Sequence, residues 1–273
     1  MRARIRWAIY LLVFLSVLIP MLTGISFPVG RISESTQAVF DYIESLPEGS
    51  VVAISFDYGP SVIPDVQPIA KALIAHCFKR NLKVMGFALW PTGEPLGRRA
   101  FEEVAEKMGK VYGEDYVYFG YRAGYSTVML QMGEDIRKVF EQDYRKTPTD
   151  RIPMMKHIRN YKDIDLLVDL AAGDSVETWI VYAYTKFGQK LAAGVTGVIV
   201  SQMYPYIQAG QLVGVIPAMR GGAEYEELID YSKLLGEPGM AKTGMSIQSI
   251  VHLLLMILIA IGNLEFVMMR RRR

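Results

Sequence analysis

Each end of this 273-residue chain carries an apolar run flanked by arginines. Residues 7–22 follow three arginines within the first six residues, and a second run, whose core is 250–261, stops at the four arginines 270–273. A helix needs about 20 mostly apolar residues to cross a bilayer, and arginine is retained on its cytoplasmic side. The pattern predicts a protein of the cytoplasmic membrane with two spans and both termini cytoplasmic.

The two runs divide the chain into three predicted parts. These are an N-terminal anchor, an extracytoplasmic domain and a C-terminal anchor with an arginine tail, at 1–27, 28–245 and 246–273. The first run also has the basic start and apolar core of a cleaved secretory signal. Its length and the lack of a clean small-residue cleavage site favour retention, but both interpretations stay open.

The formal net charge of +2 conceals an uneven distribution of charge. Seven of the 30 basic residues lie in the terminal flanks, against one of the 28 acidic residues, so the domain between them is mildly acidic. No stripe of Lys and Arg occurs inside it, which excludes nucleic acid as a partner. The single cysteine, Cys77, rules out an intrachain disulfide and is expected in the core.

Short apolar runs alternate with helical patterns between the anchors. Strands are expected at 51–56, 83–90, 116–121, 164–171 and within 190–200, and helices at 35–46, 65–80, 97–110, 126–140 and 176–187. Strands that are apolar throughout are typical of a parallel sheet covered on both faces. We therefore predict an α/β fold with a doubly wound, mainly parallel five-stranded sheet, Rossmann- or flavodoxin-like.

The last part of the domain is harder to interpret. Residues 201–236 are expected to form a helix broken near Gly210 or Pro217. An alternative is a third membrane span at 191–219, which several polar residues, among them Gln202 and Gln208, disfavour. Within this part, 204–219 mixes small and apolar residues as an interface helix would.

Ligands of such sheets bind beyond the carboxyl ends of the strands. Asp57 directly follows the first strand and is the first candidate, with Arg122 as a matching contact for an anion and Ser126 at the start of a helix. The further candidates at these ends are Tyr58, Thr92 and Asp174. The same residue types cap helices and form turns in any α/β protein, so a structural role stays open.

Several catalytic motifs are absent from the sequence. It contains no phosphate-binding loop, no dinucleotide fingerprint after the first strand and no nucleophile elbow. Its three histidines, His76, His157 and His252, exclude a histidine-rich metal cluster, and neither a metal nor a cofactor is expected. A non-enzymatic role is favoured.

Three segments, 115–124, 163–174 and 204–215, resemble a family of uncharacterised prokaryotic membrane-anchored proteins. The resemblance implies the architecture with two anchors and carries no activity, cofactor or site residue.

These observations lead to two functional hypotheses. The first is a binding, scaffolding or assembly component at the outer face of the cytoplasmic membrane, in contact with the lipid bilayer, as a homo-oligomer or with other membrane proteins. The alternative is an extracytoplasmic enzyme or ligand sensor for a small anionic molecule, with its site at the carboxyl ends of the strands.

Overall fold

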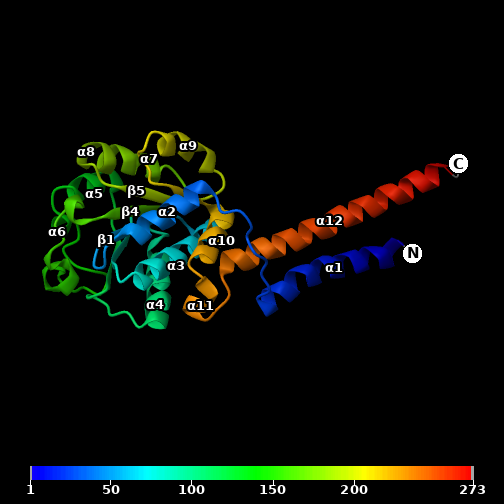
Figure 1. Cartoon of the computed structure of the whole chain (residues 1–273), viewed down its shortest axis with the longest axis horizontal. Coiled ribbons are helices and arrows are strands. Elements are labelled where there is room, and N and C mark those ends of the chain that lie inside the picture. The colour runs from blue at the N-terminus through cyan, green and yellow to red at the C-terminus, as the bar shows by residue number, and fades with distance from the viewer. Residues whose placement is uncertain (1, 272–273) are drawn as a thin grey trace.

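The computed structural model describes residues 2–271, so Met1, Arg272 and Arg273 lie outside the described residues. Two long helices, α1 (Arg2–Thr23) and α12 (Met240–Arg271), project side by side from one end of an α/β domain (Figure 1). Both contain a stretch long and apolar enough to cross a membrane, and they are the two helices of the described chain that do. The predicted anchors are therefore helical.

One parallel sheet runs through the domain. Its strands are β1 (Val51–Asp57), β2 (Lys83–Ala88), β3 (Tyr116–Tyr121), β4 (Leu166–Ala171), β5 (Leu191–Val195) and β6 (Val215–Pro217). They lie in the order β3-β2-β1-β4-β5-β6, which is the order of the doubly wound dinucleotide-binding folds. The predicted parallel α/β fold is confirmed. The strand count of five was too low by one.

The missed strand is β6. Residues 201–236 do not form one broken helix, because α9 (Val200–Gln208) is followed by β6, α10 (Ala218–Leu228) and α11 (Tyr231–Leu235). Val215 to Pro217 pair with β5, and the Ser35 hydroxyl contacts both the N–H and the C=O of Val215 along the outer edge, at 2.6 and 2.8 Å. A three-residue edge strand that ends in proline leaves almost no pattern in a sequence.

This arrangement also corrects two predictions for the same region. The proposed interface helix at 204–219 is wrong, because the segment contributes to α9, a loop, β6 and the start of α10, and Val215 and Ile216 are buried in the sheet. The alternative of a third span at 191–219 fails for the same reason.

The other helices begin near their predicted positions. They are α2 (Glu34–Ser45), α3 (Ile63–Lys79) and α4 (Glu94–Met108), and the expected helix at 126–140 is split into α5 (Tyr125–Met132) and α6 (Ile136–Val139). The expected helix at 176–187 contains α7 (Ser175–Trp179), a π-helical turn η5 (Ile180–Tyr184) and α8 (Thr185–Phe187). Short 3₁₀ turns lie at η1 (Pro60–Val62), η2 (Thr149–Arg151), η3 (Pro153–Lys156) and η4 (Tyr161–Asp163).

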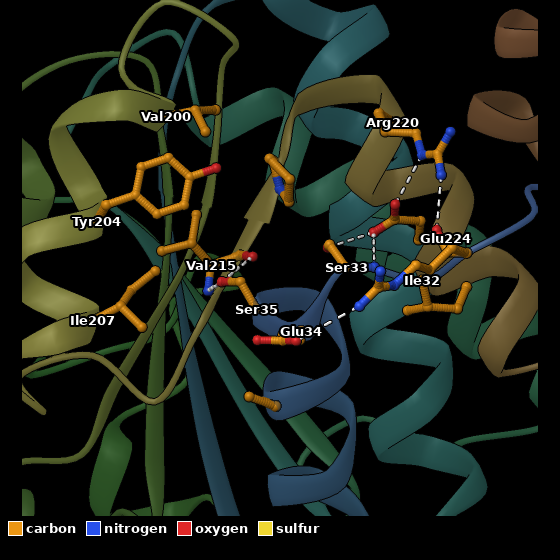
Figure 2. Close-up of a pocket in the computed structure, with 13 residues that line it drawn as sticks. Ile32, Ser33, Glu34, Ser35, Val200, Tyr204, Ile207, Val215, Arg220 and Glu224 are labelled. Carbon is orange, nitrogen blue, oxygen red and sulfur yellow. Dashed lines mark hydrogen bonds and ion pairs between the residues drawn. The ribbon is translucent and has the colours of Figure 1, made fainter.

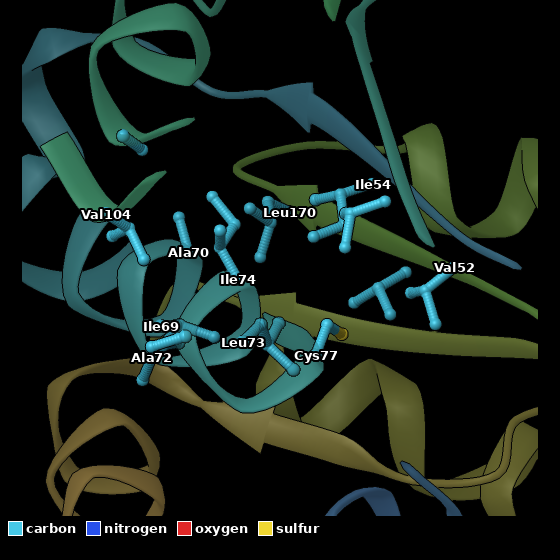
Figure 3. Close-up of a cluster of buried hydrophobic side chains, with 14 of the residues drawn as sticks. Val52, Ile54, Ile69, Ala70, Ala72, Leu73, Ile74, Cys77, Val104 and Leu170 are labelled. Carbon is cyan, nitrogen blue, oxygen red and sulfur yellow. The ribbon is translucent and has the colours of Figure 1, made fainter. Parts of the chain in front are cut away.

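Helix α3 is the centre of the larger core. Its apolar residues, including Ile69, Leu73 and Cys77, pack on the sheet against Ile54 and Leu170 (Figure 3). Cys77 is fully buried, as predicted. Burying one large aliphatic side chain contributes about 1.5–3 kcal/mol, so this layer accounts for much of the stability of a domain without disulfides.

The first turns of α12 belong to the domain. Ala241 packs on Gly222 of α10, where an added Cβ would lie 3.1 Å from the Ala241 Cβ. The buried carboxylate of Glu226 accepts hydrogen bonds from the backbone N–H groups of Ala241 and Lys242, at 3.0 and 2.8 Å. The domain thus caps the N-terminus of α12 through Glu226 and packs against the first turns of this helix through α10.

Candidate functional site at the carboxyl ends of the strands

Two buried aspartates, Asp57 and Asp169, lie on the two central strands of the sheet, where the strand order changes direction. Strands β1 and β4 are neighbours, and their register places Ser55 opposite Asp169 and Asp57 two residues further along β1. Side chains two residues apart lie on the same face of a strand, so Asp57 and Asp169 occupy the same face. Their exposed fractions are 0% and 1%. This is the topological switch point of the fold.

The two carboxyl groups have different partners. Asp57 accepts hydrogen bonds from the Ser55 hydroxyl at 2.6 Å and from the Leu89 N–H at 2.8 Å. Both Asp169 oxygens are buried, and neither accepts a hydrogen bond from another group among the described residues. A donor that could reach them is a proton on the carboxyl group of Asp57. The arrangement suits one proton held between Asp169 and Asp57.

Burial sets the titration of the pair. Burial raises the pKa of Asp57, while the donors Ser55 and Leu89 act in the opposite direction. The pKa of Asp169 rises well above its ordinary value, first through burial and then through the charge of Asp57. Two buried carboxyl groups that lie next to each other cannot both ionise readily, so burial and the neighbouring charge favour a protonated form of the pair.

Polar atoms without partners surround this pair. The Ser175 hydroxyl beside Asp169 and the Trp179 indole N–H beside Asp57 are both buried, and neither forms a hydrogen bond of normal geometry within residues 2–271. The π-helical turn η5 begins directly after Trp179. π-Helical turns are frequent at functional sites, and buried polar groups without partners need an explanation.

Sequence reasoning found Asp57 but missed Asp169, Ser175 and Trp179. The signal for Asp169 was present, because it is the one acid within the otherwise apolar strand β4. A charge in a strand that is buried on both faces is costly, so an acid at such a position is itself a signal of a functional residue.

Tyr58 and Thr92 have structural roles in the turns. Tyr58 is fully buried and donates its hydroxyl to the Gln67 side chain at 2.6 Å. Thr92 donates its hydroxyl to the Tyr58 carbonyl at 3.2 Å. Together they connect the turn after β1 with the turn after β2.

The remaining candidates are not gathered around Asp57. The Arg122 guanidinium lies over the Phe140 ring at 5.9 Å, and no ion pair with an acid is recorded for it in the described part of the chain. Ser126 is half-buried in the first turn of α5, and Asp174 is exposed beside the Tyr125 hydroxyl, 3.5 Å away. The structure therefore pairs Asp57 with a second acid instead of with Arg122.

A cavity of 560 Å³ lies at the β6 edge of the sheet (Figure 2). Its apolar wall comes from α9 and β6, with Tyr204, Ile207 and Val215, and its polar wall includes Arg220 and Glu224 of α10. The buried Glu224 accepts hydrogen bonds from the Ser33 hydroxyl at 2.6 Å and from the Arg220 Nε at 2.8 Å. Burial alone would raise the pKa of Glu224, but these donors outweigh it and lower the pKa.

A second cavity, of 730 Å³, separates the carboxyl edge of the sheet from α12. The domain contributes Asp65 from the first turn of α3, Gly197 from the turn after β5 and Ala218 from the start of α10, directly after β6. The facing wall is the part of α12 from Gly244 to His252. The edge where ligands bind in this fold is therefore the edge from which the apolar helices leave the domain.

Within residues 2–271, no group of three or more His, Cys, Asp or Glu is arranged to hold a metal ion. Comparison with protein-family models yields no match for this chain, and comparison with curated proteins yields none either. The resemblance noted in the sequence stays a prediction, and a functional conclusion depends on the geometry described above.

Proposed function

We propose that this chain is a membrane-tethered α/β domain that binds a partner or ligand at the membrane surface, with the carboxyl edge of its sheet turned toward the bilayer. The observation that carries the proposal is the 730 Å³ cavity between that edge and α12. A domain held by two helices at one end cannot turn this edge away, so its ligand must be in or near the membrane.

The surface of this edge supports the orientation. Val198, in the turn after β5, is 84% exposed, and the exposed side chains of Tyr121 and Phe27 lie at the last residue of β3 and after α1. Exposed aromatic and aliphatic side chains are stabilised at the boundary between headgroups and hydrocarbon. Both described chain ends lie at the far ends of the apolar helices (Figure 1), which suits arginine-flanked termini in the cytoplasm and a domain outside.

Spin labelling of the full chain in lipid nanodiscs tests the orientation. We expect a nitroxide on Val198→Cys to be accessible to oxygen dissolved in lipid and shielded from a water-soluble nickel complex. The matched control, Glu48→Cys, lies in the exposed turn before β1 at the opposite edge and should show the reverse. Cys77 need not be replaced, because burial raises the pKa of its thiol to about 12. Equal nickel accessibility at both positions would contradict the proposal.

The second candidate is an extracytoplasmic enzyme or ligand sensor, and the buried Asp57–Asp169 pair with its unpartnered neighbours favours it. Asp169→Asn keeps the shape of the side chain and removes its acidity. If a cellular phenotype of the deletion strain is rescued by this variant as well as by the wild type, the pair has no chemical role. A variant that folds and does not rescue would favour chemistry at this site. The acids here suit a neutral or cationic ligand better than an anion.

Homo-oligomerisation stays a proposal of its own. Without the expected interface helix, the exposed faces of the paired α1 and α12 are the surface best suited to contact between copies. Light scattering of the detergent-extracted protein should then give a protein mass well above 30.7 kDa after subtraction of the micelle. A mass equal to one chain would exclude it.

A further inference from the structure

Arg220 lies where three hollows meet at the base of the anchors. It lines the 560 Å³ cavity at β6, the 730 Å³ cavity at α12 and a smaller one of 150 Å³ beside Phe27 and Ser246. The residue stands in the first turn of α10, and its side chain is 46% exposed. A guanidinium in this position can reach any group that enters the space between the domain and the apolar helices.

The local contacts hold the guanidinium in place and leave part of it free. Its Nε donates to Glu224 at 2.8 Å and its Nη2 donates to the Arg31 carbonyl at 2.9 Å. Nη1 forms no hydrogen bond or ion pair among residues 2–271. A fixed guanidinium with spare N–H donors is well suited to bind a phosphate group, because less side-chain entropy is lost on binding.

An acid without a partner lies in the wall of the same cavity. Asp65 is half-buried in the first turn of α3, and its carboxylate forms no ion pair or side-chain hydrogen bond among residues 2–271. The 730 Å³ cavity therefore offers a guanidinium and a free carboxylate to one occupant. This combination is complementary to a molecule that carries a phosphate and an ammonium group.

The remaining wall indicates where the occupant comes from. Helix α12 contributes Met245, Ile247 and Val251 to the cavity and then continues through the apolar residues 253–261, most of which are exposed. A mostly apolar cavity that carries a guanidinium and a carboxylate and merges into the side of an apolar helix has the layout that a lipid requires, with the headgroup at the charged side chains and the acyl chains along the helix.

We propose that this cavity binds the headgroup of an amino-phospholipid of the phosphatidylethanolamine type from the surrounding bilayer. Arg220 binds the phosphate, Asp65 binds the ammonium group, and the acyl chains lie along α12. The proposal rests on the proposed function, because it requires the carboxyl edge to face the membrane.

Native mass spectrometry of the full chain in detergent tests the site. The probes are phosphatidylethanolamine, phosphatidylglycerol and the soluble headgroup phosphoethanolamine, each titrated against the wild type. We expect one tightly retained phosphatidylethanolamine, about tenfold weaker binding in both Arg220→Gln and Asp65→Asn, and loss of the preference over phosphatidylglycerol in Asp65→Asn. The control variants Arg99→Gln and Asp150→Asn remove exposed charges that do not line the cavity and should bind as the wild type does.

Three results would overturn the lipid site. They are unchanged binding in Asp65→Asn, equal retention of both lipids by the wild type, and binding of phosphoethanolamine as tight as that of the lipid. Arg220→Gln also removes the contacts to the buried Glu224 and to the Arg31 carbonyl, so its loss of binding can reflect lost folding. Asp65→Asn loses no hydrogen bond or ion pair among residues 2–271 and therefore decides the question on its own. If the nitroxide at Val198→Cys is exposed to lipid but no lipid is retained in the mass spectrum, the lipid site is refuted and the proposed function stands. If the nitroxide is exposed to water, both are refuted.

Discussion

Replacing Asp169 with asparagine should stabilise the domain at neutral and alkaline pH. In the folded chain the pKa of Asp169 is well above its ordinary value because the side chain is buried beside Asp57. In the unfolded chain it titrates near 3.9. Folding above that pH therefore takes up a proton, and the stability associated with Asp169 is fully present below about pH 4 and is lost as the pH rises toward the folded pKa.

The size of the effect follows from the linkage relation. Each pH unit between the unfolded and the folded pKa costs about 1.4 kcal/mol for one proton. Asparagine has nearly the same shape, carries no charge and can donate its NH₂ to Asp57, so Asp169→Asn should not show this loss.

Unfolding of the full chain in detergent, followed by tryptophan fluorescence between pH 4 and pH 8, measures the difference. Trp179 is buried next to the pair and reports on its surroundings. The stability of wild type and variant should agree near pH 4 and diverge as the pH rises. The control Asp174→Asn removes an exposed acid five positions before Trp179 and should follow the wild type. Parallel pH curves for the wild type and Asp169→Asn would refute the shared proton.

Three further predictions concern the scaffold. Burial raises the pKa of Glu226 to about 7 despite its backbone donors, so stability should fall as the pH rises from about 4.5 to 7, and Glu226→Gln should flatten that part of the thermal unfolding profile. Gly93→Ala should prevent folding, seen as rapid proteolysis, because a Cβ would lie 1.8 Å from the Phe56 carbonyl oxygen; normal protease resistance would contradict this. Tyr225→Phe should cost about 1–3 kcal/mol in denaturant unfolding, because the buried His76 Nδ1 loses its partner at 2.8 Å, and no change would show that the contact contributes nothing.

The sequence predicted the layers of this fold because its strands are buried on both faces. Strands β1 and β4 lie in the middle of the sheet and appear as continuous apolar runs. Strand β6 could not be found in this way, because its three residues are defined by pairing with β5 and by the Ser35 contact from 180 residues earlier in the chain. Strands of this kind exist only through tertiary contacts.

The sequence predicts where the candidate site lies in the fold, but it does not predict which residues surround Asp57 there. The rule that ligands bind at the carboxyl edge led correctly to Asp57 as a residue of that edge. The partner of Asp57 depends on which strand lies beside β1, and that neighbour is β4, more than 100 residues later. Arg122 follows β3 at the outer end of the sheet, so strand order alone explains why it was not brought to Asp57.

The strand order by itself would suggest a dinucleotide, and the first turn of the fold argues against one. In nucleotide-binding members of this topology, glycines let the pyrophosphate approach the N-terminus of the helix that follows β1. Here Asp57 is buried at the end of β1, Tyr58 fills the turn, and Asp65 lies in the first turn of α3. Two acids and a bulky ring oppose a phosphate at the position where the fold would hold it. The guanidinium that can bind a phosphate is Arg220, which stands after β6 and faces the apolar helices. In this sheet the group suited to a phosphate therefore lies after the last strand, beside the apolar helices, instead of after the first strand. This position favours a ligand that the membrane supplies.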